Sequence, residues 1–186
     1  MRFIYRLLFQ KILKWRIEGA PPMHLNKYII LVAPHSSNWD FLIGLATRSI
    51  LGFPSNYLAK SELFRPPYGW IFRKLGGYPV ERSRSEHLVD QVIAICNREK
   101  QFVIAIAPEG TRGNVEKWKT GFYHIARGAG IPMVLVGLDY KNRIVKWSSP
   151  IEATGDFQSV ALKIDAFFSG MHGKNRKAAK VLGGTE

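Results

Sequence analysis

The chain has 186 residues, which is the size of one ordinary domain and long enough to bury a substantial core. Its 27 Lys and Arg residues outnumber its 14 Asp and Glu residues, so the net charge is +13, while 46% of all residues are hydrophobic. This apolar content excludes intrinsic disorder, because a disordered chain of such charge lacks the side chains to form a core. The positive charge predicts an anionic partner: nucleic acid, a membrane surface or a phosphorylated substrate.

Residues 1–18 predict a basic amphipathic helix. On a helical wheel, five apolar side chains share one arc: Ile4, Tyr5, Leu8, Ile12 and Trp15. Cations surround that arc, and no acidic residue precedes Glu18. The pattern is typical of a helix that lies in a membrane interface with anionic lipids. A helix packed on the protein's own core has the same pattern, so both interpretations are open at this point.

The same cations interrupt every apolar run near the N-terminus. No stretch approaches the ~18 uncharged apolar residues of a membrane span, and the uncharged core of a cleavable signal peptide is missing. The single cysteine, Cys96, cannot form an intramolecular disulfide, which fits a reducing compartment. We therefore expect a protein without a transmembrane helix or signal peptide, which is neither exported by that route nor threaded through a bilayer.

Short apolar runs alternate with segments of helical periodicity along the rest of the chain. Five runs predict buried strands: 27–33, 55–59, 78–80, 102–107 and 131–138. A weaker edge strand is predicted at 143–147. Helices are predicted at 40–51, 66–75, 85–98, 119–128 and 156–168, the last capped by Asp156. This alternation predicts a single α/β domain over 19–169, a largely parallel mixed sheet flanked by helices, followed by a basic and flexible tail over 170–186.

A His and an Asp stand five residues apart in PHSSNWD, directly after the first predicted strand. A sharp turn can bring the Asp40 carboxylate to one imidazole nitrogen of His35, which fixes the tautomer and leaves the other nitrogen to accept a proton. That is the arrangement of a general base for a hydroxyl nucleophile. The same spacing also fits a plain helix cap at Asp40.

A second polar loop, PEGTRGN, follows the strand at 102–107. Gly110 permits a turn that brings backbone N–H groups close to a ligand, and the planar fork of Arg112 fits a phosphate or carboxylate. Lys60 and Arg82 follow two further strands. Because the carboxyl ends of parallel strands meet at one edge of a sheet, we expect these cations to gather near His35 as a site for a phosphorylated substrate.

Four segments, in this order, resemble the motifs of the glycerolipid acyltransferases, the family of 1-acyl-glycerol-3-phosphate acyltransferase. That family is marked by a His and an Asp with four residues between them, a Gly-rich strand ending in Arg, a Pro-Glu-Gly-Thr-Arg loop and an apolar strand that opens with Pro. The matching segments are 35–40, 76–82, 108–112 and 131–136. The resemblance covers about residues 27–140, and the four motifs in order make chance an unsatisfactory explanation.

The resemblance implies a glycerol-3-phosphate acyltransferase-like fold. It also implies transfer of a fatty acyl group from an acyl-CoA or acyl carrier protein thioester to the hydroxyl of a lyso-glycerolipid such as 1-acylglycerol-3-phosphate. His35 would be the general base, oriented by Asp40, with no acyl-enzyme, no metal and no further cofactor. A membrane surface with anionic lipids is the implied partner, with the protein peripheral or monotopic on the cytoplasmic face. The acceptor's head group would be bound by Lys60, Arg82, Glu109, Gly110, Thr111 and Arg112.

Other functions are compatible with parts of this pattern. Departures from the family motifs at Pro34, Ala107 and Gly113 leave room for another hydroxylated lipid acceptor, such as a lyso-aminolipid. From another class, a charge of +13 fits a nucleic-acid-binding protein, but the aromatic residues fall within apolar segments and we expect no nucleic-acid partner. A hydrolase with Ser36 or Ser37 as nucleophile is weaker, because neither serine lies in a Gly-x-Ser-x-Gly elbow.

Overall fold

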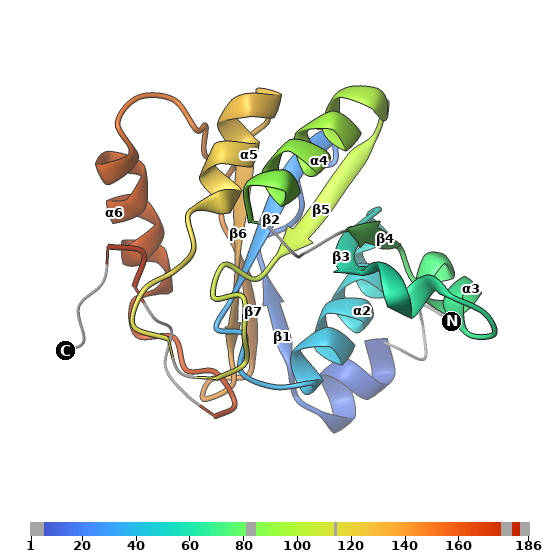
Figure 1. Ribbon diagram of the computed structural model, residues 1–186. Helices are drawn as coiled ribbons and strands as arrows, with labels where there is room; N and C mark the ends of the chain where they lie inside the picture. The colour runs from blue at the N-terminus through green and yellow to red at the C-terminus, as the bar shows by residue number, and fades with distance from the viewer. Residues whose placement is uncertain (1–5, 81–84, 114, 176–179, 183–186) are drawn as a thin grey trace.

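The computed structural model describes residues 6–80, 85–113, 115–175 and 180–182. A seven-stranded sheet of order β1-β7-β6-β2-β5-β3-β4 forms its centre (Figure 1). The strands are β1 (Arg16–Glu18), β2 (Lys27–Ala33), β3 (Asn56–Lys60), β4 (Gly77–Val80), β5 (Phe102–Ile106), β6 (Met133–Asp139) and β7 (Ile144–Trp147). Strands β2 to β6 run parallel, β7 is antiparallel to β6, and β1 is parallel to β7. The predicted α/β fold with a largely parallel mixed sheet is therefore confirmed.

Helices cover both faces of the sheet (Figure 1). They are η1 (Leu7–Ile12, a π-helix), α2 (Trp39–Leu51), η2 (Ser61–Phe64, 3₁₀), α3 (Gly69–Lys74), α4 (Ser85–Arg98), α5 (Gly121–Ala129) and α6 (Phe157–Phe168). The α4, α5 and α6 side chains pack on one face, and η1 and α2 pack on the other. Each buried strand is apolar on both sides because both faces are covered, as parallel sheets require.

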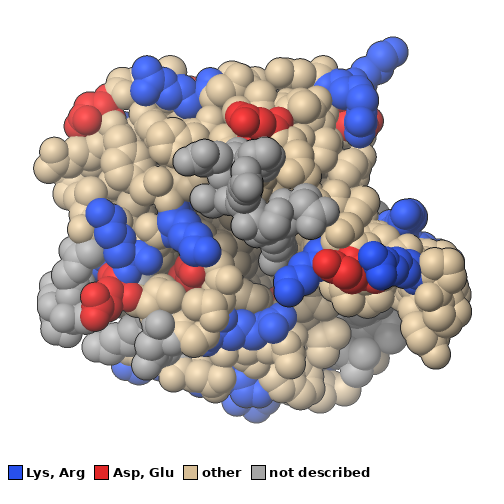
Figure 2. Space-filling view, viewed as in Figure 1, with Lys and Arg blue, Asp and Glu red and all other residues tan. Residues whose placement is uncertain are grey.

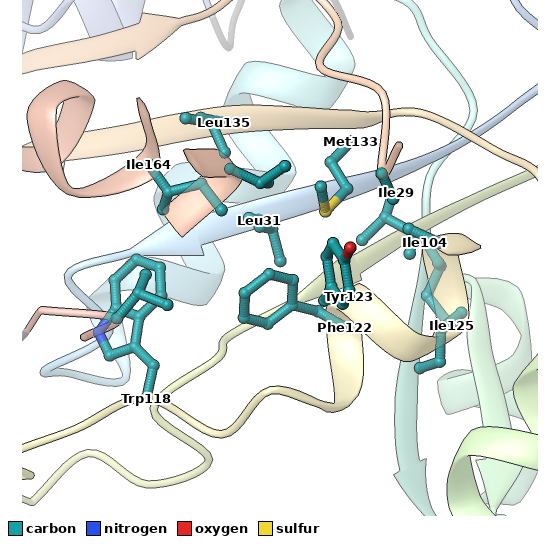
Figure 3. Packing of buried hydrophobic residues seen from close by; sticks show 14 of the residues in the cluster. Ile29, Leu31, Ile104, Trp118, Phe122, Tyr123, Ile125, Met133, Leu135 and Ile164 are labelled. Carbon is teal, nitrogen blue, oxygen red and sulfur yellow. The ribbon is translucent and has the colours of Figure 1, made fainter. Parts of the chain in front are cut away.

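The larger core lies between the sheet and helices α4, α5 and α6. Ile29 and Leu31 of β2 are fully buried against Phe122 of α5 and Ile164 of α6 (Figure 3). Helix α6 begins where predicted, because the Asp156 side chain accepts a hydrogen bond from the Ser159 N–H at 3.3 Å and caps the first turn. This packing fixes the strands whose carboxyl ends carry the candidate site.

The predicted N-terminal helix is wrong beyond Ile12, because the chain turns there and forms β1 beside β7. Phe9 and Trp15 are buried, with exposed fractions of 1% and 6%. They pack against the sheet and do not form part of an exposed apolar face. Strand β1 also covers β7, so the strand predicted at 143–147 is not at the edge. Residues 1–5 of the predicted helix lie outside the described residues.

Part of the predicted tail packs against the domain within the residues that the structure describes. Met171 and Val181 are buried in the larger core, and the Val181 N–H donates a 2.6 Å hydrogen bond to the Asp165 carboxylate of α6. The prediction of a flexible tail rested on the basic residues of this segment. It overlooked the apolar residues among them, which anchor the segment in the core. Within the described ranges, none of the helices is both long and apolar enough to cross a membrane.

Candidate active site

The loop after β2 and the start of α2 bring His35 and Asp40 together. His35 Nδ1 lies 3.2 Å from Asp40 Oδ2, and the Asp40 side chain is almost fully buried. Asn38 stands at the N-cap of α2, so Asp40 is in the first turn of the helix and is not its cap. The carboxylate turns back toward the loop instead, which gives the contact that the five-residue spacing predicts.

Four hydrogen-bond donors converge on the Asp40 carboxylate. Oδ2 accepts the Ser36 N–H at 2.7 Å and the Ser37 N–H at 2.8 Å, in addition to His35 Nδ1. Oδ1 accepts the Tyr140 hydroxyl at 2.6 Å. Burial raises the pKa of this carboxyl, but the hydrogen bonds outweigh burial, and the pKa lies below its ordinary value. Asp40 is therefore held ionised as an acceptor for His35.

This contact decides which imidazole nitrogen can accept a proton. An ionised carboxylate accepts from Nδ1–H, so the neutral ring carries its lone pair on Nε2. The His35 side chain is 21% exposed, which allows a substrate to approach the ring while Asp40 stays buried. Neutral His35 in this tautomer can take a proton from a hydroxyl group that reaches Nε2.

Glu109 fixes the backbone of His35. It follows β5, the direct neighbour of β2 in the sheet, and is 1% exposed. The His35 N–H lies 3.1 Å from both carboxylate oxygens of Glu109. Glu109 therefore holds the loop that carries the imidazole, a role different from the head-group contact that the resemblance implies.

Two residues of this network were missed by the sequence reasoning. Tyr140 follows β6, the other neighbour of β2, and burial together with its bond to Asp40 raises the pKa of its phenol, so the hydroxyl remains a donor. Asn175 donates from its backbone N–H to Ser36 Oγ at 3.3 Å and from Nδ2 to the Ser36 carbonyl at 2.8 Å. The rule that polar residues after parallel strands share an edge could have found Tyr140 but not Asn175.

The cations predicted to bind the head group lie farther apart than His35 and Asp40 do. Lys60 is the last residue of β3, and β5 lies between β3 and β2. The Lys60 Cα therefore lies two strand spacings, roughly 10 Å, from β2 along the edge of the sheet. Gly110 has the positive φ of 69° that the predicted turn requires, and Thr111 and Arg112 beside it are exposed. Arg82 lies outside the described residues. Figure 2 shows several Lys and Arg groups in the lower half of the view, toward which the carboxyl ends of the strands point in Figure 1.

One further cation lies against the second loop. A side chain added at Gly110 would come within 3.2 Å of the Lys119 side chain, and the Lys119 N–H donates to the Pro108 carbonyl at 3.0 Å. Lys119 thus adds a positive charge beside Gly110 and Arg112 that the motif pattern did not indicate. Among the described residues, no three His, Cys, Asp or Glu side chains are grouped as metal ligands would be.

The fold and the dyad define a class: an α/β domain with a His–Asp pair at the carboxyl edge of its parallel strands. The chain belongs to the acyltransferase family, whose model matches residues 14–139. The match contains His35, Asp40 and the loop of Glu109, so the family resemblance seen in the motifs is confirmed.

Characterised relatives share part of the chain. It is 28% identical over 129 residues to the 1-acyl-sn-glycerol-3-phosphate acyltransferase of Salmonella typhimurium, a stretch that covers 65% of this chain and 51% of that protein. The Escherichia coli K12 protein of the same name is 28% identical over 130 residues, with the same coverage of each chain. The chain thus spans about half the length of these relatives.

A solved structure has a similar fold. The crystal structure of the 1-acyl-sn-glycerophosphate (LPA) acyltransferase PlsC from Thermotoga maritima superimposes with a TM-score of 0.58. The likeness covers 89% of this chain and 76% of that one, at 16% sequence identity. The overall architecture of this chain is therefore that of the solved acyltransferase.

Proposed function

We propose that this protein transfers a fatty acyl group from a thioester of coenzyme A or acyl carrier protein to the free hydroxyl of a lyso-glycerolipid such as 1-acylglycerol-3-phosphate. The observation that carries the proposal is the 3.2 Å contact between His35 Nδ1 and a buried, hydrogen-bonded Asp40 carboxylate. Family membership and the names of the relatives support the same reaction.

The dyad supplies the proton transfer that the reaction needs. Nε2 of His35 takes the hydroxyl proton as the acceptor oxygen attacks the thioester carbonyl, and Asp40 stabilises the resulting imidazolium. The carbon–sulfur bond then breaks, and the proton on His35 passes to the departing thiolate. The products are an ester and a free thiol. The Ser36 and Ser37 N–H groups are committed to Asp40, so donors to the carbonyl oxygen come from other groups.

The surrounding cations suit a phosphorylated acceptor. Lys60 at the carboxyl end of β3 and Arg112 beyond the carboxyl end of β5 are exposed, and Lys119 lies against Gly110. We assign them, together with Arg82, to the head group of the acceptor. Because such an acceptor is a membrane lipid, we place the reaction at the cytoplasmic surface of a membrane, with the protein bound peripherally through its positive charge.

An acyl-transfer assay tests the proposal. Purified protein should release thiol from acyl-CoA or acyl carrier protein only when a lyso-lipid is present, and mass spectrometry should detect the diacyl product. His35→Gln should lower kcat by about 10²–10⁴, whereas the exposed control His124→Gln on α5 should match the wild type. Full activity in His35→Gln would refute the mechanism.

The acceptor assignment needs its own measurement. Arg112→Ala should raise the KM for a phosphorylated acceptor and leave the KM for the acyl donor unchanged. A panel of lyso-lipids with and without a phosphomonoester would identify the preferred head group. A change confined to the donor's KM would place Arg112 on the wrong substrate.

A further inference from the structure

The segment from η2 to α3 displays an unusual cluster of large apolar side chains on its outer surface. Leu63 is 45% exposed, Tyr68 67%, Trp70 63% and Ile71 38%. These four are a third of the twelve exposed large hydrophobic residues found in the described chain, and they fall within nine consecutive positions. We call them the η2–α3 surface. Exposed apolar side chains that gather in one region mark interaction sites, whereas single scattered ones are normal on a protein surface.

The local fold keeps these side chains outside. Phe64 is 8% exposed and packs edge-on against Phe72 at 6.1 Å, so a different pair of aromatic rings anchors the segment. A side chain at Gly69 would collide with the Phe64 backbone, and one at Gly77 would come within 2.9 Å of the Phe64 ring. The inner face of the segment is therefore closely packed. A small shift of the segment could not bury the four outer side chains there.

Positive charge surrounds the η2–α3 surface. Positions 60–74 contain a single acidic residue, Glu62, and four exposed cations: Lys60, Arg65, Arg73 and Lys74. In Figure 2 the lobe at the right of the view, where Figure 1 draws α3, has an uncharged tip with Lys and Arg beside it and an acidic side chain among them. A hollow of about 280 Å³ lined by Pro67, Trp70 and Arg73 opens on the same segment.

We propose that the η2–α3 surface is where this protein contacts an anionic lipid bilayer, an inference that rests on the proposed function insofar as the acceptor is a membrane lipid. Trp and Tyr side chains favour the level of the lipid head groups, where one end of the ring meets hydrocarbon and the other meets water. Lys and Arg beside them are attracted to anionic lipids. The η2–α3 surface, with its exposed apolar side chains and the cations of the same segment, complements a negatively charged bilayer.

The position of the surface links it to the dyad. Segment η2 begins directly after Lys60, at the carboxyl end of β3. That end lies on the same sheet edge as His35 and Glu109, because β3 pairs with β5 and β5 pairs with β2 in parallel. A bilayer held at this surface would lie beside the edge at which the acceptor hydroxyl must reach His35.

Vesicle binding tests the proposal. The full chain should co-sediment with phosphatidylcholine vesicles that contain phosphatidylglycerol, and the Tyr68→Ser/Trp70→Ser variant should bind at least tenfold more weakly. Leu162→Ser removes a 56% exposed residue from α6 and should bind like the wild type. Arg65→Gln/Lys74→Gln should also weaken binding, whereas the control Lys100→Gln/Lys163→Gln, with the same loss of charge elsewhere, should have a smaller effect. Far-UV circular dichroism would show that each variant is folded.

A second measurement locates the contact directly. Brominated lipids should quench tryptophan fluorescence in the wild type, and Trp70→Phe should lose much of this quenching while still binding. The proposal is overturned if Tyr68→Ser/Trp70→Ser binds like the wild type, or if only Ile12→Ser/Leu13→Ser in the N-terminal segment abolishes binding. Equal binding to pure phosphatidylcholine would overturn the anionic assignment. Wild-type protein that binds vesicles through this surface but esterifies no lyso-lipid would support the surface and refute only the proposed reaction.

Discussion

Replacing Tyr140 with Phe removes a single oxygen atom from the network around the dyad. The lost group is the hydroxyl that donates a 2.6 Å hydrogen bond to Asp40 Oδ1. A hydrogen bond to a charged group contributes about 1.5–3 kcal/mol to stability. For a domain of this size, each kcal/mol lowers Tm by about 2–4 °C, so Tyr140→Phe should melt about 3–12 °C below the wild type at pH 7.

The pH dependence of this effect follows from the Asp40 carboxyl. Its pKa in the folded protein lies below its ordinary value of 3.8, and the Tyr140 hydroxyl contributes to that lowering. The stability gained from ionised Asp40 is therefore present above pH 3.8 and is lost as the pH falls through the lowered pKa. Without the hydroxyl, the folded pKa should rise, so the difference between wild type and variant should be largest near neutral pH and shrink in acid.

The assay is unfolding of both proteins from pH 7 down to about pH 2, through the range in which the Asp40 carboxyl becomes protonated in the folded protein, together with acyl-transfer kinetics at pH 7. Because the Tyr140 hydroxyl is bonded to Asp40 and acts on His35 through that carboxylate, kcat should fall while KM changes little. Tyr123→Phe is the matched control, since it removes a hydroxyl that donates at 3.1 Å to the neutral Gly155 carbonyl. A stability difference for Tyr140→Phe that stays constant or grows in acid would refute this reasoning.

Three other changes test the rest of the structure. Asn175→Ala removes the side-chain bond from Nδ2 to the Ser36 carbonyl, leaves the backbone bond to Ser36 Oγ, and should cost about 1 kcal/mol, measured by urea unfolding, with a lower kcat; unchanged kcat would separate the Asn175 side chain from the dyad loop. Ile164→Ala, at a fully buried α6 position, should cost about 2–5 kcal/mol without altering KM in the folded protein. Burial raises the pKa of Cys96 to about 11, so its thiol should react with a disulfide reagent at pH 8 only after unfolding; fast reaction in the native state would contradict its burial.

Much of the fold is predictable because the buried strands and amphipathic helices have distinct apolar periods. Strand β2 and helix α4 occupy the predicted residues 27–33 and 85–98. The N-terminal segment could not be predicted, because apolar spacing alone does not distinguish a helix on a membrane from one packed on its own domain. Strand β1 has only three residues, too few for any alternation to be visible.

In the candidate site, contacts between residues close in sequence could be predicted, and contacts between distant residues could not. His35 and Asp40 are close in sequence, so their contact follows from one turn. Tyr140 and Asn175 contact Asp40 and Ser36 across 100 and 139 positions, respectively. The first contact depends on β6 lying next to β2, and the second depends on the path of the chain after α6. Neither sheet order nor that path follows from residue types alone.

Contacts from distant parts of the chain therefore decide how long a fragment must be to hold His35 and Asp40 in place. The stretch matched by the acyltransferase family model ends at Asp139, one residue before the tyrosine that binds the Asp40 carboxylate. Trp15 packs edge-on against that tyrosine at 5.0 Å, and Asn175, far along the chain after α6, bonds to Ser36 in the dyad loop. A fragment that contains only the motif segments would keep His35, Asp40 and Glu109 but would lose the contacts made by Trp15 and Asn175. The cooperative unit for engineering or expression is longer than the part that sequence motifs define.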